Sequence, residues 1–218
     1  ARASLGRYFA VMGDEKPAKF MIAKKLPARF SEKDSMEVLW QEHASLTQEF
    51  YKVEREIDIR QKSLQEMPTP ERSYLDLKIE IAKRILLSCH FCTRRCGVNR
   101  FEDKVGFCRC GSEITVSSIF EHVGEEPELV PSGTIFTMGC TMCCRHCQNW
   151  TISQWTEKGE VYRPEELARE VEHLRENGCR NANLVGGEPT PWLEQWLETF
   201  QCVSVNVPIV WNSNTYYS

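Results

Sequence analysis

The chain has 218 residues and a formal net charge of −4, with 27 Lys and Arg against 31 Asp and Glu. Its 41% hydrophobic content is that of an ordinary folded domain. No run approaches the ~18 consecutive apolar residues of a membrane-spanning helix, so no membrane contact is expected. The scattered basic residues give no nucleic-acid footprint. Residues 1–7 lack a secretion signal core, and the 11 cysteines therefore suggest metal ligation in a cytoplasmic protein.

The first 87 residues are expected to be helical and carry no motif. Residues 1–30 are basic and punctuated by proline, which predicts an arm draped over the body. A capping-box-like start at Ser31 predicts a long helix whose apolar residues follow one stripe: Leu39, Leu46, Phe50, Val53, Ile57 and Leu64. Residues 68–70 are expected to end it and to cap a second helix reaching about Leu87, although the alternation at 75–81 also fits a strand.

A first cysteine group follows, with the spacing Cys-x2-Cys-x3-Cys-x11-Cys. We define it as Cys89, Cys92, Cys96 and Cys108, with Cys110 left over. Two ligand-bearing loops separated by a linker are typical of a metal site. Zinc would stabilise a small loop-rich subdomain, whereas an iron–sulfur cluster would add an electron path, and the spacing leaves both open.

A second cysteine group comes directly after the apolar run 134–139, as Cys140-x3-Cys144-x2-Cys147. Three thiolates on one short loop can hold three irons of a 4Fe–4S cluster and leave the fourth iron free for another ligand. Two zinc knuckles that also use Cys143 are the alternative, but four ligands within eight residues would be cramped.

The residues after this loop predict a βαβ crossover. Pro164 opens a helix that Gly178 ends, and residues 181–185 form a buried strand. The turn Gly186-Gly187-Glu188-Pro189 then meets the cysteine loop at the carboxyl edge of a parallel sheet. Its glycines allow close backbone approach to a ligand, and Glu188 offers a carboxylate to a cationic amine.

Two further elements complete the expected sheet. Thr190 is expected to cap a helix at 191–201, so the turn also has a purely structural explanation. A third strand is expected over 203–211, with Asn212, Ser213 and Asn214 at its carboxyl end. Three parallel strands alone would leave an unpaired edge, which favours a chain that is the N-terminal part of a longer protein.

These motifs together resemble the radical S-adenosylmethionine (SAM) superfamily. Within it, residues 70–218 look like uncharacterised iron–sulfur proteins homologous to pyruvate formate-lyase activating enzyme. The resemblance implies a 4Fe–4S cluster on Cys140, Cys144 and Cys147, and SAM bound by the Gly-Gly-Glu-Pro turn. Asn212, Ser213 and Asn214 fit the same group. His146 stands where such loops usually carry an aromatic residue beside adenine.

The expected architecture is α/β, a partial radical SAM (βα) barrel of about three units at 133–218. It follows N-terminal helices at 1–87 and a cysteine-rich metal-binding subdomain at 88–132. The resemblance implies an oxidoreductase that cleaves SAM to a 5′-deoxyadenosyl radical for hydrogen abstraction. Its expected partners are a flavodoxin or ferredoxin as electron donor and an activase-type protein substrate. Radical modification of a small molecule or RNA, and a metal-stapled binding module or truncated remnant, are the alternatives.

Overall fold

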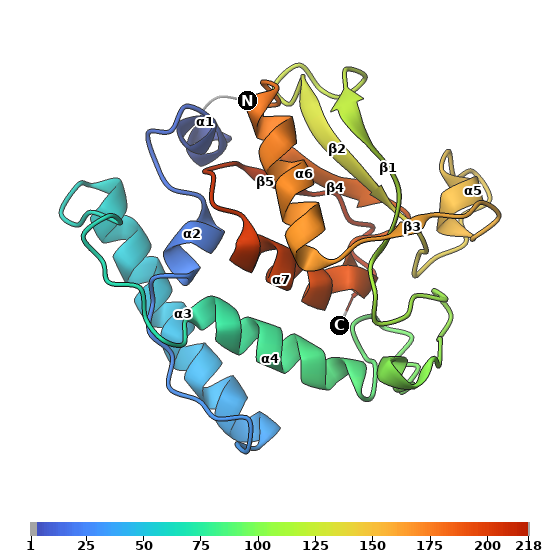
Figure 1. Ribbon diagram of the computed structural model, residues 1–218, viewed down its shortest axis with the longest axis horizontal. Helices are drawn as coiled ribbons and strands as arrows, with labels where there is room; N and C mark the ends of the chain where they lie inside the picture. The colour runs from blue at the N-terminus through green and yellow to red at the C-terminus, as the bar shows by residue number, and fades with distance from the viewer. Residues whose placement is uncertain (1–3, 218) are drawn as a thin grey trace. The chain divides into compact units, whose positions relative to one another are not determined.

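The computed structural model describes residues 4–217, so residues 1–3 and 218 of the predicted segments lie outside the described part. The chain forms two compact units, Ala1–Ala82 and Lys83–Ser218 (Figure 1). The division falls within helix α4, Tyr74–Leu86. In residues 4–217, no helix is both long and apolar enough to cross a membrane.

The long helix of the first unit is α3, Met36–Asp58. Leu39, Leu46, Phe50 and Val53 of the predicted stripe are buried. The predicted start at Ser31 is wrong, because Ser35 is the residue whose side chain accepts the Val38 N–H, at 3.4 Å. Ser31 donates its own N–H to Asp34, at 2.7 Å, and so belongs to a turn before the helix.

The predicted N-terminal arm is partly helical over its described residues. It folds into α1, Gly6–Met12, and α2, Lys19–Ala23. Phe20 and Ile22 of α2 are buried, and α2 packs against α3. Buried apolar side chains therefore make this segment part of the core of the first unit.

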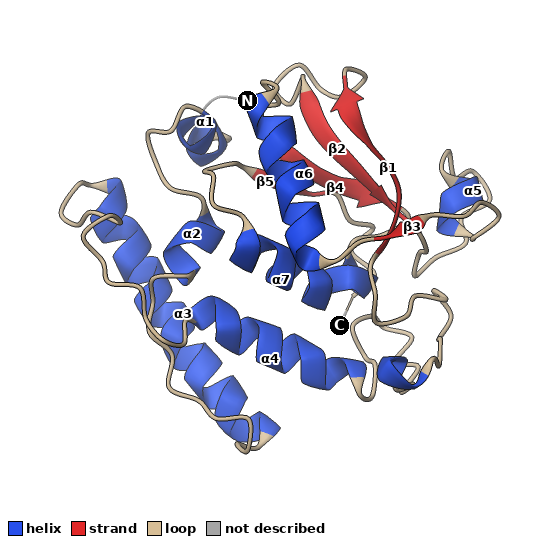
Figure 2. Ribbon diagram, in the orientation of Figure 1, coloured by secondary structure: helices blue, strands red, loops and turns tan. Residues whose placement is uncertain are grey.

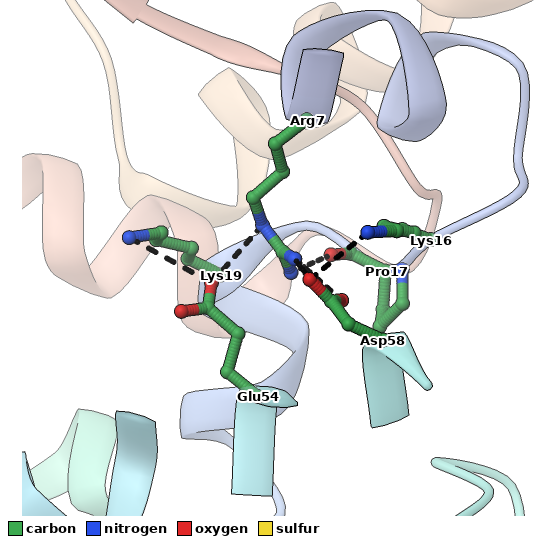
Figure 3. A network of polar contacts seen from close by, with 6 residues as sticks. All are labelled: Arg7, Lys16, Pro17, Lys19, Glu54 and Asp58. Carbon is green, nitrogen blue, oxygen red and sulfur yellow. Dashed lines mark hydrogen bonds and ion pairs between the residues drawn. The ribbon is translucent and has the colours of Figure 1, made fainter. Parts of the chain in front are cut away.

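Arg7 of α1 joins two carboxylates of α3 (Figure 3). Its Nη1 lies 2.6 Å from each Asp58 carboxylate oxygen, and its Nε lies 3.0 Å from Glu54 Oε1. Lys16 also donates to Asp58, at 3.0 Å. Burial favours the protonated carboxyl, but hydrogen bonds from Arg7 and Lys16 outweigh it and lower the pKa of Asp58.

Helix α4 confirms the helical interpretation of residues 74–86 over the strand. Its cap is a reciprocal pair: the Asp76 carboxylate accepts from the Ser73 N–H at 2.7 Å, and the Asp76 N–H donates to Ser73 Oγ at 3.2 Å. The Pro-Thr-Pro segment is therefore not the cap, because a nearer Ser-x-x-Asp pair fulfils that function.

The second unit contains a five-stranded sheet in the order β3-β1-β2-β4-β5 (Figure 2). Its strands are β1 (Thr115–His122), β2 (Ser132–Thr137), β3 (Glu160–Val161), β4 (Ala182–Gly186) and β5 (Ile209–Trp211). β2, β4 and β5 run parallel, whereas β1 pairs antiparallel with both β2 and β3. The β2 edge that the sequence left unpaired is thus covered by β1, a strand that was not predicted.

Two longer helices connect the parallel strands. α6, Pro164–Glu176, joins β2 to β4, and α7, Leu193–Cys202, joins β4 to β5. α6 packs across β1, β2 and β4 and against α7. The predicted inner face of α6 is confirmed, since Leu167, Ala168, Val171 and Leu174 are buried. Short helical turns lie at α5 (Trp150–Ser153), η1 (Arg100–Glu102) and η2 (Thr190–Trp192).

Two local predictions near the end of the chain were wrong. The third strand spans only Ile209–Trp211, because Pro208 has no N–H for a strand ladder. Thr190 does not cap the following helix. Its hydroxyl and its N–H both donate to Glu188, at 2.6 Å and 3.1 Å, so the turn preceding the helix occupies its side chain.

We predict that Arg7→Ala lowers the free energy of unfolding by about 1 kcal/mol at pH 7, because it removes the ion pairs with Asp58 and Glu54. The folded pKa of Asp58 lies below its ordinary value of 3.8. The stabilisation is therefore complete above that value and is lost as the pH falls through the folded pKa. Urea unfolding at pH 7 and pH 3 measures both effects. Arg29→Ala, at an exposed arginine of the same unit, is the control. A difference between Arg7→Ala and the parent protein that does not shrink at pH 3 would contradict the prediction.

Candidate functional site

Three loops meet where the parallel strands end. The cysteine loop follows β2, the Gly-Gly-Glu-Pro turn follows β4, and residues 212–214 follow β5. Because these strands are parallel, their carboxyl ends share one edge of the sheet. The predicted βαβ crossover is confirmed, and it brings the second cysteine group to the glycine turn.

The two glycines allow the β4 turn to touch the cysteine loop. Gly186 has φ +110°, which side-chain-bearing residues rarely adopt. A Cβ on Gly187 would collide with the carbonyl oxygen of Gly139, the residue before Cys140. Asn149 Nδ2 donates to the Gly186 carbonyl at 3.4 Å. The close approach that the sequence predicts toward a ligand is thus also an approach between two loops of the protein.

Glu188 is a buried anchor, with only 1% of its surface exposed. Its Oε1 accepts from the Thr190 N–H and hydroxyl and from Ser213 Oγ, the last at 2.7 Å. Its Oε2 accepts from the Asn214 N–H at 2.8 Å. Four donors from the protein occupy this carboxyl group and tie the β4 turn to the β5 turn. Direct contact with a substrate ammonium would therefore need one of these bonds to open.

Asn214 links the β5 turn to the cysteine loop. Its Nδ2 donates to Thr141 Oγ1 at 3.0 Å and lies 3.5 Å from Cys140 Sγ. Of the three residues predicted after β5, Ser213 and Asn214 thus join the site through Glu188 and Cys140. Asn212 has an exposed side chain, and its backbone N–H extends the pairing with β4 by donating to Leu184.

Cys140, Cys144 and Cys147 are partly exposed on one loop, and Cys143 between them is exposed. The Cys147 thiol lies 3.6 Å from Ser153 Oγ. Burial raises the pKa of Cys140 to about 11, although the Met142 N–H counteracts it, so metal binding there would displace a proton. In residues 4–217, no three His, Cys, Asp or Glu side chains are close enough to hold one metal ion. The donor set itself, three soft sulfurs on one loop, fits an iron–sulfur cluster.

The other predicted cofactor residues differ in solvent exposure. His146 is exposed on the cysteine loop. Pro189 is buried at the start of η2. The roles of these residues, like that of Glu188, stay predictions.

The first cysteine group lines a cavity in the same unit. Cys89, Cys92, Cys96 and Cys108 all border it, together with Phe91, Val98, Arg100, Gly106, Phe107, Thr141 and Pro191. The Cys89 N–H donates to Val98 O and the Gly97 N–H to Cys89 O, both at 2.9 Å, which closes the loop. Burial raises the pKa of Cys92, and the charges of the other three cysteines add to this effect. A hydrogen bond from the Arg94 backbone opposes it.

A buried arginine lines this cavity. Arg100 is 3% exposed; its Nη1 donates to Pro191 O at 2.6 Å, and its Nη2 lies 3.5 Å from Cys108 Sγ. A hydrogen bond from Cys110 and the charge of Arg100 lower the pKa of Cys108 to about 6, against the opposing effect of burial. Cys108 is therefore the thiol of this group best prepared to bind metal as a thiolate.

The two cysteine groups share structural elements. Thr141, next to Cys140, lines the cavity of the first group and accepts a hydrogen bond at its carbonyl from Arg94 Nε, at 2.7 Å. Trp155 Nε1 donates to Cys108 O at 2.8 Å. Sequence reasoning missed Thr141 and Trp155, because neither belongs to a spacing motif. The sequence indicated only that the two cysteine groups follow one another along the chain, and not that they lie side by side.

Comparisons with known proteins agree with the geometry of this edge. Residues 134–217 match the family described as the radical SAM superfamily. The chain is 42% identical over 218 residues to an uncharacterized protein of Methanocaldococcus jannaschii, MJ0674, covering 97% of this chain and 62% of that protein. It is 29% identical over 130 residues to a second uncharacterized protein of that organism, MJ0808, covering 51% and 38%. No solved structure matches the chain.

The family match supports a radical SAM domain over residues 134–217, in the second unit. The chain spans 62% and 38% of the two relatives, both uncharacterized, so they identify no substrate.

We predict that Gly187→Ala destabilises the second unit by about 2–4 kcal/mol, because its Cβ cannot fit beside the Gly139 carbonyl. Gly111→Ala is the matched control, since its Cβ would meet nothing within 4 Å and its effect should stay within about 1 kcal/mol. Thermal unfolding measures both. Equal stability of the two variants would show that the loops do not touch as described.

Proposed function

We propose that this protein is a radical SAM enzyme of the activating-enzyme type, which abstracts a hydrogen atom from a carbon of a protein substrate. The observation that carries the proposal is the junction of the second cysteine group with the Gly-Gly-Glu-Pro turn, inside the segment that matches the superfamily. The activating-enzyme assignment rests on the resemblance of residues 70–218. It names a reaction type, since the fold alone does not identify a substrate.

In this proposal Cys140, Cys144 and Cys147 hold a 4Fe–4S cluster. When bound, the cluster supplies the electron that cleaves SAM to a 5′-deoxyadenosyl radical. Asn214 orients Cys140 through its amide, and Glu188 holds the β4 and β5 turns at a fixed separation. His146 and Asn212, both exposed, and the Gly186-Gly187 backbone form the face open to SAM. The protein thus supplies position, while the cofactors supply the chemistry.

The proposal includes a second metal at the first cysteine group, zinc or an iron–sulfur cluster. It also includes a one-electron donor such as flavodoxin or ferredoxin, since superfamily members usually need a reductant. A protein or peptide is the proposed substrate, by analogy with activases that generate glycyl radicals.

We predict that Cys144→Ala abolishes binding of the SAM-responsive cluster and that Cys143→Ala retains it. Only Cys144 has a place in the Cys-x3-Cys-x2-Cys ligand set, although Cys143 is its neighbour and is more exposed. Anaerobic reconstitution, followed by electron paramagnetic resonance of the reduced protein with and without SAM, measures the outcome. A parent spectrum that SAM leaves unchanged would reject the open iron, and loss of the signal in Cys143→Ala would reject this ligand assignment.

We also predict that the reduced full-length protein slowly converts SAM to 5′-deoxyadenosine, and that its Cys144→Ala variant does not. Because the cluster is the electron source, formation should require reductant and cease in air. Chromatography of anaerobic reactions quantifies the product. If the protein has an intact, SAM-responsive cluster but forms no 5′-deoxyadenosine, the result would instead support a non-catalytic binding module stabilised by metal.

A further inference from the structure

The cavity of the first cysteine group has the composition of a closed metal site. Four thiols reach it from two segments, 89–96 and 108, and Phe91, Phe107 and Pro191 supply apolar wall. Gly106 is needed for this arrangement, because a Cβ there would lie 2.7 Å from Cys96 Sγ. Side chains from several loop segments thus converge on one small cavity.

The buried position of Arg100 favours an anion in this cavity. The guanidinium is 3% exposed, and no carboxylate pairs with it within residues 4–217. Two of its nitrogens contact Pro191 O and Cys108 Sγ, but Nε is buried and has no partner among the described residues. A buried guanidinium with an unused N–H is costly, and a negatively charged acceptor in the cavity would remove that cost.

A single zinc ion fits these observations less well than an iron–sulfur cluster. Zinc bonds of about 2.3 Å in a tetrahedron would hold the sulfurs within about 4 Å of one another. Zinc would use all four thiolates and bring no acceptor of its own for the buried Arg100 Nε. A cluster binds each thiolate to a different iron, so its ligands lie further apart. Its inorganic sulfides also add acceptors, which would give Arg100 Nε a partner.

We propose that Cys89, Cys92, Cys96 and Cys108 bind a second iron–sulfur cluster, with Arg100 donating N–H groups to its sulfurs and offsetting its negative charge. This inference deepens the proposed function, which places zinc or an iron–sulfur cluster at this site, but it does not require that the protein cleaves SAM. Only the magnetic test described below also requires the cluster at Cys140, Cys144 and Cys147.

The two sites are close enough to influence each other. A Cβ on Gly139 would lie 2.9 Å from Cys108 O, and Gly139 is covalently joined to Cys140. A ligand of one group therefore contacts the neighbour of a ligand of the other. Two paramagnetic clusters held in this way should show spin–spin interaction when both are reduced.

The first experiment isolates the site. A Cys140/Cys144/Cys147→Ala triple variant is reconstituted anaerobically with iron and sulfide in the presence of equimolar zinc, and its metal and acid-labile sulfide are measured. We expect iron and sulfide to remain bound. Adding Cys96→Ala should remove them, whereas adding Cys202→Ala should not, and both cysteines are exposed. Zinc without sulfide, or no metal in a variant with native circular dichroism, overturns the proposal.

The second experiment tests the role of Arg100 with a readout that zinc cannot give. In the same triple variant, Arg100→Gln should shift the midpoint potential of the cluster to more negative values, because a positive charge next to a cluster favours its reduced form. Arg100→Lys should restore the potential in part. A potential unchanged in Arg100→Gln would exclude Arg100 as a partner of the cluster.

The third experiment uses the parent protein. Electron paramagnetic resonance of the fully reduced protein should show spin–spin broadening that is lost in either Cys96→Ala or Cys144→Ala. Iron at the first group with no SAM-responsive cluster at the second would refute the proposed function alone. A SAM-responsive cluster at the second group with no iron at the first group would refute this inference alone.

Discussion

The parallel pairing of β2 with β4, and the contact of Gly187 with Gly139 that it imposes, is the constraint on which the rest of the site depends. The register joins Thr137 to Gly186, so the chain leaves both strands at the same level and toward the same edge. A side chain on Gly187 would separate the two loops. Because they touch, the cysteine loop has a fixed wall, and Glu188 and Asn214 can complete it from two further segments.

The sequence was most informative where one periodic pattern coincided with clear end signals. α6 is an example, since its apolar positions, its initial Pro164 and its final Gly178 all indicated the same helix. The crossover from β2 to β4 followed from it, and with that the meeting of the two motifs could be predicted. The superfamily match covers this same segment and the β5 turn.

The rest depended on tertiary contacts that a pattern along the chain does not record. β1 pairs antiparallel with β2, and its mixed residues alternate too weakly to identify it beside a cysteine-rich segment. Glu188 looks like a free carboxylate in the sequence, yet donors as far away as Ser213 and Asn214 occupy it. Arg100 was one of several basic residues near the first cysteine group, and only its burial distinguishes it.

The bond between Asn214 and Cys140 joins residues 74 positions apart, and this separation orders events during synthesis. The cysteine loop leaves the ribosome well before the β5 turn that completes its surroundings. At synthesis rates of about 5–20 residues per second, several seconds pass in which Cys140 has neither its amide partner nor the Glu188-anchored turn. Loading of metal into the growing chain would therefore meet an open, solvent-exposed loop, and the finished pocket would form only after β5 has joined the sheet.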